Sequence, residues 1–149
     1  MILKTFTVEY SEVVSVIETN IQISEDYDLD FYKDKIYPST YLFDATWDTG
    51  AMVSVISTKV INELGLKPTG KETVYHGGGA CVSYKYLVNM FLPNDIVFAS
   101  LEVIGMPISV DVLIGMDIIS KGDFAITASE GKTVFSFQIP STNKIIFKK

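Results

Sequence analysis

The residue whose type and setting best suit chemistry is Asp48, in the run 47–51, which reads Trp-Asp-Thr-Gly-Ala. Asp, Thr and Gly are ordinary turn residues, so the triplet alone predicts only a tight turn. Its flanks add to this, because a mostly apolar run, 41–47, precedes the turn and a β-branched run follows it. A turn between two core-type strands holds a carboxylate rigidly, as acid–base catalysis requires. Asp48 is therefore a candidate catalytic carboxylate.

Two later segments place glycine where a backbone must turn or approach another closely. Residues 112–117 read Val-Leu-Ile-Gly-Met-Asp, which alone indicates a buried strand ended by Gly115. Between this segment and Asp48 lies 76–79, His-Gly-Gly-Gly, flanked by strand-type residues. That pattern predicts a hairpin with a flexible tip. The three segments in this order are more specific than any one of them.

This ordered set resembles the retropepsin-like aspartic peptidases, which include the viral enzymes and bacterial relatives. In that family an apolar strand leads into Asp-Thr-Gly-Ala, a glycine-rich hairpin flap follows, and an apolar-apolar-Gly segment opens a short helix. The resemblance covers roughly residues 40–125 and does not explain residues 1–38. It implies an all-β fold, a closed β-barrel of the retropepsin or acid-protease type with one or two short helices.

The resemblance also implies a role for each matching residue. Asp48 would be the catalytic carboxylate, and Thr49 would hydrogen-bond across to its symmetry mate. Gly50 would allow close backbone approach and donate its N–H toward the carboxylate. The substrate-binding residues would be Ala51 and the four residues of the hairpin tip, His76, Gly77, Gly78 and Gly79.

A catalytic dyad needs two carboxylates, but the chain carries one Asp-Thr-Gly triplet, and Asp111 and Asp117 lack the Thr-Gly. The resemblance therefore implies a homodimer in which Asp48 of each subunit meets its mate on a two-fold axis. The implied activity is that of an aspartic endopeptidase. It hydrolyses a polypeptide substrate with an activated water and forms no covalent intermediate.

Two departures from the family pattern bear on the dimer and the core. Viral members often carry Gly-Arg-Asn or Gly-Arg-Asp where this chain has Gly115-Met116-Asp117, and the chain contains no Arg. Any ion pair made by that Arg is absent, so the dimer contacts are expected to differ. Trp47 replaces a smaller aliphatic residue, and we expect it to fill the core rather than the floor of a cleft.

Two other functions stay open at this point. One is a non-catalytic peptide-binding or dimerisation module of the same fold. The other is an unrelated β-barrel that binds a small ligand, with Asp48 in a plain turn. A nucleophilic pair of Cys81 and His76 is disfavoured, because five residues across a Gly-rich turn give poor geometry. With one Cys and one His the chain offers no Cys/His metal cluster, and we expect no metal and no cofactor.

The elements that must position these residues can be predicted from periodicity. We expect residues 1–40 to form an N-terminal arm of short strands and loop packed on the core, and residues 41–149 to form the barrel domain. A helix is expected from an N-cap at Ser57 to Gly65, and a second over 116–120. The expected strands are two within 2–23, then 41–47, 52–56, 73–75, 80–84, 85–92, 96–104, 110–114, 133–138 and 144–147.

Charge and composition exclude several classes of partner. The net charge is −6 and all basic residues are Lys, which disfavours a nucleic-acid partner. No stretch approaches the ~20 apolar residues of a membrane span, so we expect no membrane partner. The first residues lack the apolar segment of a signal peptide, and the chain has one cysteine; both favour a cytoplasmic location.

Overall fold

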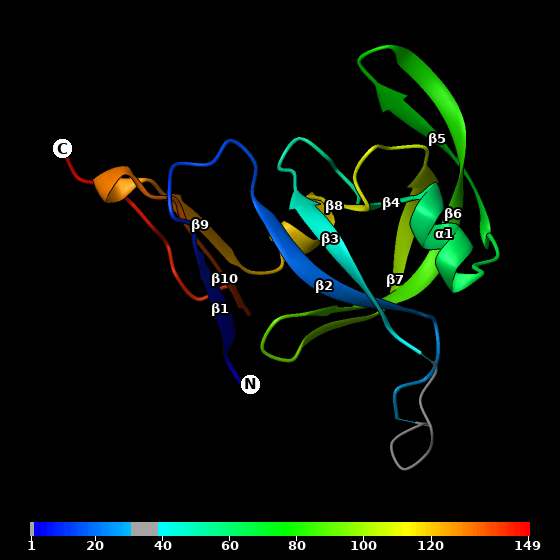
Figure 1. The fold of residues 1–149 in the computed structure, drawn as a ribbon, viewed down its shortest axis with the longest axis horizontal. Helices are drawn as coiled ribbons and strands as arrows, with labels where there is room; N and C mark the ends of the chain where they lie inside the picture. Colours follow the sequence, from blue (N-terminus) through cyan, green and yellow to red (C-terminus); the bar gives the residue numbers. More distant parts are fainter. Residues whose placement is uncertain (1, 31–38) are drawn as a thin grey trace.

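The computed structural model describes residues 2–30 and 39–149. Within these residues strands dominate and the helices are short, which confirms the predicted all-β fold (Figure 1). The elements are β1 (Lys4–Glu9), β2 (Glu18–Glu25), β3 (Tyr41–Trp47), β4 (Val55–Ser57), α1 (Thr58–Leu64), β5 (Gly70–His76), β6 (Gly79–Leu92), β7 (Ile96–Met106), β8 (Val112–Ile114), α2 (Met116–Ile119), β9 (Asp123–Thr127), the 3-10 turn η1 (Ser129–Gly131) and β10 (Val134–Ile139).

Six strands of the described chain form a closed barrel. They are ordered β2-β3-β8-β4-β7-β6, and β2 pairs again with β6, which joins the two ends of the sheet. The closing pairs are antiparallel and run from Gln22 opposite Phe91 to Glu25 opposite Val88. β5 lies outside this ring and pairs only with β6 among the described strands. The predicted closed β-barrel is therefore confirmed.

β6 contributes to both the barrel and a projecting hairpin, and within the barrel part it changes register near Asn89. Such a shift is typical of a β-bulge, which bends a strand. The Asn89 amide is fully buried and donates to the carbonyl oxygens of Glu25 and Tyr27, at 3.3 Å each. Its oxygen accepts from the Ser100 N–H at 2.9 Å. The second half of β6 closes the ring, and the first half leaves it with β5.

A second sheet joins segments from the two halves of the sequence. Its order is β1-β10-β9, and Phe6 of β1 lies opposite Phe137 of β10. We call this the terminal sheet. The strand pairing does not follow the expected boundary between residues 40 and 41. β2 is part of the barrel, whereas β9 and β10 leave it to pair with β1 (Figure 1).

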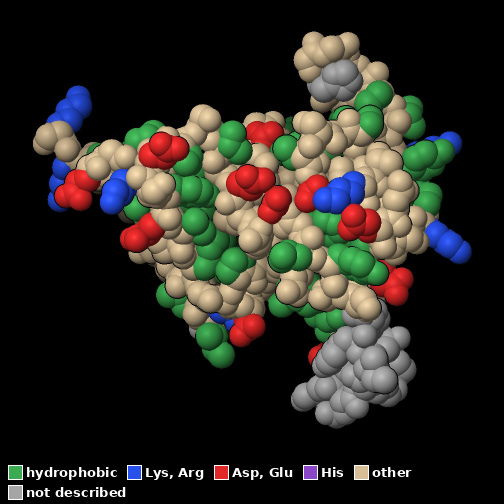
Figure 2. Space-filling view, viewed as in Figure 1, with side chains coloured by type: hydrophobic (Ala, Val, Ile, Leu, Met, Phe, Trp, Pro, Cys, Tyr) green, Lys and Arg blue, Asp and Glu red, His purple; other side chains and the backbone are tan. Residues whose placement is uncertain are grey.

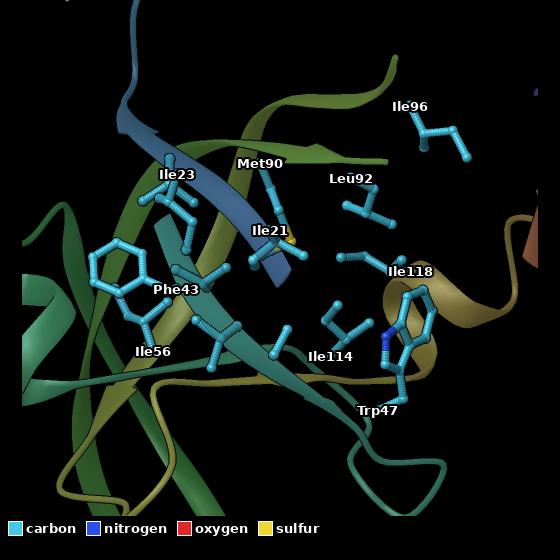
Figure 3. Packing of buried hydrophobic residues seen from close by; sticks show 14 of the residues in the cluster. Ile21, Ile23, Phe43, Trp47, Ile56, Met90, Leu92, Ile96, Ile114 and Ile118 are labelled. Atoms are coloured by element: carbon cyan, nitrogen blue, oxygen red, sulfur yellow. The ribbon is translucent and has the colours of Figure 1, made fainter. Parts of the chain in front are cut away.

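The core is continuous from the barrel to the terminal sheet. Ile21, Ile23, Phe43 and Ile56 fill the barrel, and Trp47 lies at its edge near Ile118 (Figure 3). Trp47 is 6% exposed, and its ring centroid lies 4.9 Å from that of Phe135 and 5.1 Å from that of Phe137. Its indole N–H donates to the Thr19 hydroxyl at 2.9 Å. The expectation that Trp47 belongs to the core is confirmed.

Several predicted elements need correction. The strand expected over 52–56 forms only from Val55, because residues 52 and 53 bend around Gly115. The strand expected over 144–147 is wrong: its apolar residues suit a strand, but no neighbouring edge pairs with them in the described chain. β9 was not expected. Within the N-terminal arm expected over 1–40, residues 31–38 lie outside the described residues.

The surface reflects the acidic composition. Figure 2 shows acidic side chains gathered over the middle of the visible face, with a basic side chain among them. One ion pair is formed by Lys59 and Asp111, whose charged atoms lie 3.2 Å apart. Within the described ranges, no helix is both long enough and apolar enough to cross a membrane.

Candidate active site

The Asp48 turn is fixed by backbone hydrogen bonds on each side. β3 ends at Trp47, and the Asp48 N–H donates to the carbonyl oxygen of Ile114 at 2.8 Å. The Ala51 N–H donates to the Asp48 carbonyl oxygen at 3.1 Å and so closes the turn. Gly50 donates its N–H to the Asp48 side-chain oxygen Oδ1 at 2.8 Å, as predicted. The half-buried carboxylate is thereby oriented by the chain that carries it.

Two glycines allow this packing. A Cβ on Gly50 would lie 3.1 Å from Asp48 Oδ1, which is close enough to displace the carboxylate. A Cβ on Gly115 would lie 2.8 Å from the backbone oxygens of Ala51 and Val53, and backbone atoms cannot move aside cheaply. The segment 112–115 therefore ends in glycine because the turn that follows β8 lies directly against the Asp48 loop and leaves no room for a side chain.

A hydrogen-bonded pair, Ser54 and Asp117, holds the far end of the loop. The fully buried Ser54 donates its N–H to Asp117 Oδ2 at 2.9 Å and its hydroxyl to Oδ1 at 2.8 Å. The same hydroxyl accepts from the Gly115 N–H at 3.1 Å, and Ile118 donates its N–H to Asp117 Oδ1 at 2.9 Å. These bonds tie residues 48–54 to α2.

Sequence reasoning missed this pair. The sequence predicts Ser54 within the strand over 52–56, and it offers Asp117 only as an alternative to Asp48 that lacks the Thr-Gly. The available signal was an acid two residues after Gly115, at the first turn of a short helix, where carboxylates commonly accept backbone N–H groups. The other candidate, Asp111, accepts from the Asp44 N–H at 3.1 Å in addition to pairing with Lys59.

The hairpin of β5 and β6 carries the predicted substrate-binding glycines at its tip. Its strands pair from Gly70 opposite Lys85 to His76 opposite Gly79, and Gly77 and Gly78 form the turn. Gly79 has φ +125°, a conformation that side chains rarely adopt. In Figure 1 the hairpin projects on the same side of the barrel as the loop between β3 and β4. The fold thus brings both motifs to one side.

Other residues considered from the sequence divide into three groups. The side chain of His76 lies outside the described residues, so its predicted role stays a prediction. Cys81 lies on β6, with Sγ 3.7 Å from the Ser83 hydroxyl. Among apolar residues close in sequence to the two motifs, Ile56 is fully buried in the core and cannot line a cleft, whereas Val53, Val74 and Val82 keep exposed surface.

Comparison with known proteins identifies this arrangement. The family model described as aspartyl protease matches residues 41–118, which is more than half of the chain. The search of curated proteins returned no match.

Two solved structures share the fold. A retropepsin-like aspartic protease from Rickettsia conorii has a TM-score of 0.53 at 11% identity, over 91% of this chain and 94% of that one. EIAV protease, solved with an inhibitor, has a TM-score of 0.52 at 19% identity, over 74% of this chain and 90% of that one. The predicted retropepsin-type barrel is confirmed. The family match and the barrel agree: this chain belongs to the aspartyl protease family and is an aspartic peptidase, a hydrolase.

Proposed function

We propose that the chain is a homodimeric aspartic endopeptidase whose dyad consists of Asp48 from two subunits. The observation that carries this proposal is that a single chain already fixes the orientation of the Asp48 carboxylate. Its carboxylate is already oriented by the Gly50 N–H at 2.8 Å, in the one Asp-Thr-Gly turn the sequence contains. Asp111 and Asp117 are engaged in structural hydrogen bonds, so neither is a natural second member. A second copy of the chain would supply it.

The chemistry follows from bringing two carboxylates together. Two adjacent carboxyl groups cannot both ionise easily, so they share a proton, as is general for aspartic-protease dyads. The ionised Asp48 takes a proton from a bound water, and the water oxygen attacks the scissile carbonyl carbon. The protonated Asp48 of the partner donates to the carbonyl oxygen, which gives a neutral gem-diol. The first Asp48 then returns the proton that it took from water to the peptide nitrogen, the C–N bond breaks and the amine leaves. One diol hydroxyl gives its proton to the ionised Asp48, so the dyad again holds one proton. No bond forms between enzyme and substrate, and the titration belongs to the pair.

The remaining site residues would position the partner and the substrate. Thr49 is exposed at the tip of the turn, where it can hydrogen-bond to the equivalent loop of the second subunit. Ala51 follows directly and keeps partial exposure, so it could contact substrate beside Asp48. The hairpin with Gly77, Gly78 and Gly79 would close as a flap over an extended polypeptide, which would bind as an added strand through backbone hydrogen bonds. His76 would contact substrate from the same flap.

The direct test is Asp48→Asn, assayed against a mixed peptide library between about pH 3 and pH 7. We expect cleavage by the wild type, with a maximum at acidic pH, and loss of cleavage in the variant. Asp95→Asn is the matched control. Asp95 lies in the exposed β6–β7 turn at φ +60°, which Asn tolerates well, so activity should persist.

Mixing and sedimentation test the dimer. At equimolar wild type and Asp48→Asn, random pairing halves the number of wild-type dimers, so activity should fall to about half. Activity that survives Asp48→Asn would sink the dyad mechanism. A wild type that stays monomeric and inactive at micromolar concentration would favour the non-catalytic peptide-binding module.

A further inference from the structure

Residues 144–149 combine positive charge with exposed apolar surface. They read Lys-Ile-Ile-Phe-Lys-Lys. The exposed fraction is 61% for Ile145, 68% for Ile146 and 91% for Phe147, although Ile and Phe are among the residue types most often buried. Packing within the chain therefore does not account for these side chains. We call residues 144–149 the basic apolar segment.

The charge of the chain is divided unevenly around this segment. Four of the 12 Lys lie in residues 132–149, which contain no Asp or Glu, so this part carries +4. The other eight Lys stand against all 18 acidic residues, so residues 1–131 carry −10. The ion pairs found among the described residues join Lys59 to Asp111 and Lys85 to Glu102, and neither uses a lysine of the basic part. Such an asymmetry points to an anionic partner.

The segment begins at a fixed point of the terminal sheet. Asp123 of β9 accepts the N–H groups of Thr142 and Asn143 at 2.9 and 2.8 Å, and Lys144 follows directly. Figure 2 shows basic side chains at the end of the molecule that is marked C in Figure 1, and the hairpin of β5 and β6 projects at the other end. A partner bound to the segment would therefore leave the hairpin free.

The chemistry of the segment favours one class of anionic partner. A nucleic acid could accept the lysines through its phosphates, but it would leave three consecutive apolar side chains in water, and the chain has no Arg. An anionic membrane surface accommodates both kinds of side chain, with lysines among the headgroups and Ile and Phe at the acyl boundary. Spanning a bilayer needs ~20 apolar residues and binding to its surface does not, so the expected absence of a membrane partner excludes only a spanning segment.

We propose that the basic apolar segment binds the surface of an anionic phospholipid membrane and holds the peptidase there. Repulsion between the membrane and the acidic remainder of the chain does not prevent this. Six residues of extended chain reach about 20 Å, whereas the Debye length is about 8 Å at physiological ionic strength. Binding by one such segment is weak and reversible. The inference does not depend on the proposed homodimer, which would only add a second segment.

Cosedimentation of the full chain with lipid vesicles tests the proposal. We expect at least tenfold stronger binding to equimolar phosphatidylcholine and phosphatidylserine than to phosphatidylcholine alone. Lys148→Glu with Lys149→Glu should weaken binding to the anionic vesicles at least tenfold, and Phe147→Ala should weaken it about tenfold. In Phe147→Trp, the fluorescence emission should shift to shorter wavelength when anionic vesicles are added, because the new indole enters the interface.

Matched controls change the same charge and the same kind of side chain elsewhere. Lys67→Glu with Lys121→Glu alters two exposed lysines outside the basic part, and Leu42→Ala removes an exposed apolar side chain; neither should change binding. Melting curves and peptide cleavage in solution should be alike for all variants. Equal binding to both kinds of vesicle, equal loss in the control variants, or binding to a single-stranded oligonucleotide without binding to vesicles would overturn the inference. The assignment as an aspartic peptidase would stand in each case.

Discussion

At the scale of single residues, the geometry of the Asp48 turn depends on groups that lie outside the Asp-Thr-Gly triplet. Ser54 is the clearest case, because its hydroxyl donates to Asp117 and accepts from the Gly115 N–H. Asp117 in turn joins the loop to α2. The Asp48 turn is thus positioned at its start by Ile114 and at its end by Ser54, with Asp48 between the two anchors.

Replacing Ser54 tests this anchoring. Ser54→Ala leaves the Gly115 N–H and one Asp117 oxygen without a hydroxyl partner in a buried setting, which costs about 1–3 kcal/mol of unfolding free energy. We expect kcat to fall by a larger factor than KM changes, since the loop carries the proposed reacting group. Urea unfolding and peptide kinetics measure the two effects. Ser54→Thr keeps the hydroxyl and should restore part of both; equal behaviour of the two variants would contradict the anchoring role.

The sequence was informative at this scale where a residue makes its contacts locally. The Gly50 N–H bond to Asp48 spans two residues and was predicted, as was the Ser57 hydroxyl that caps α1 by accepting from the Val60 N–H. The pairing of Ser54 with Asp117 spans 63 residues and was missed. No local pattern distinguishes a buried serine that bonds a distant carboxylate from one in a strand.

At the scale of elements, strand existence was easier to predict than strand partners. The runs 41–47 and 96–104 are mostly apolar and form β3 and most of β7. The runs expected over 80–84 and 85–92 form one strand, β6, because Lys85 pairs with both Gly70 of β5 and Ile104 of β7, so the ladder continues through the expected boundary. The segment 144–147 suits a strand equally well but has no partner edge in the described chain. Pairing is a tertiary property that periodicity does not encode.

The Asp123 carboxylate, on β9, binds the residues that follow β10 through hydrogen bonds. The Ser141 hydroxyl donates to one of its oxygens, and the N–H groups of Thr142 and Asn143 donate to the other at 2.9 and 2.8 Å. These donors, with the Gln138 amide, favour the ionised form and hold the pKa of the Asp123 carboxyl well below its usual range. We call these hydrogen bonds the Asp123 clamp, and they turn the chain back along the terminal sheet.

This clamp predicts a pH-dependent contribution to stability. Because the folded pKa of Asp123 is depressed, its stabilisation is complete above the unfolded value near ~3.9 and is lost as pH falls through the folded value. Asp123→Asn should therefore lower Tm at neutral pH, and the difference from wild type should shrink below about pH 4. Thermal melts from about pH 2 to pH 8 measure this. A difference that stays constant across the acidic range would contradict the clamp.

At the scale of the whole molecule, the family match and the folding unit do not coincide. The matched residues, 41–118, contain the Asp48 loop, the hairpin and α2, but they lack β2 and the terminal sheet. β2 lies between β3 and β6 and closes the ring. The resemblance to the family could be recognised in the sequence over the matched residues. The contribution of residues 4–25 to the barrel and the terminal sheet could not be predicted, because their strand patterns are short and their pairing strands are distant in sequence.

We therefore expect a fragment of residues 41–118 to fail to fold. Without β2 the edges of β3 and β6 are unpaired, and without β10 the Trp47 ring loses Phe135 and Phe137. Far-ultraviolet circular dichroism and urea titration should show no cooperative transition in the fragment and one in the full chain. Adding residues 2–40 alone should not restore full stability, since the terminal sheet would still be absent. A cooperatively folded fragment would contradict this view.

The terminal sheet has a consequence for when the enzyme can become active during synthesis. Thr5 pairs with Gln138, so the sheet forms only after nearly all of the described chain has left the ribosome. Until then Trp47, the residue before Asp48, lacks the Phe135 and Phe137 rings that pack against it. The Asp48 turn thus gains part of its support late. A nascent chain would carry the Asp-Thr-Gly sequence without this support, so we expect peptidase activity to appear only after β10 has been synthesised.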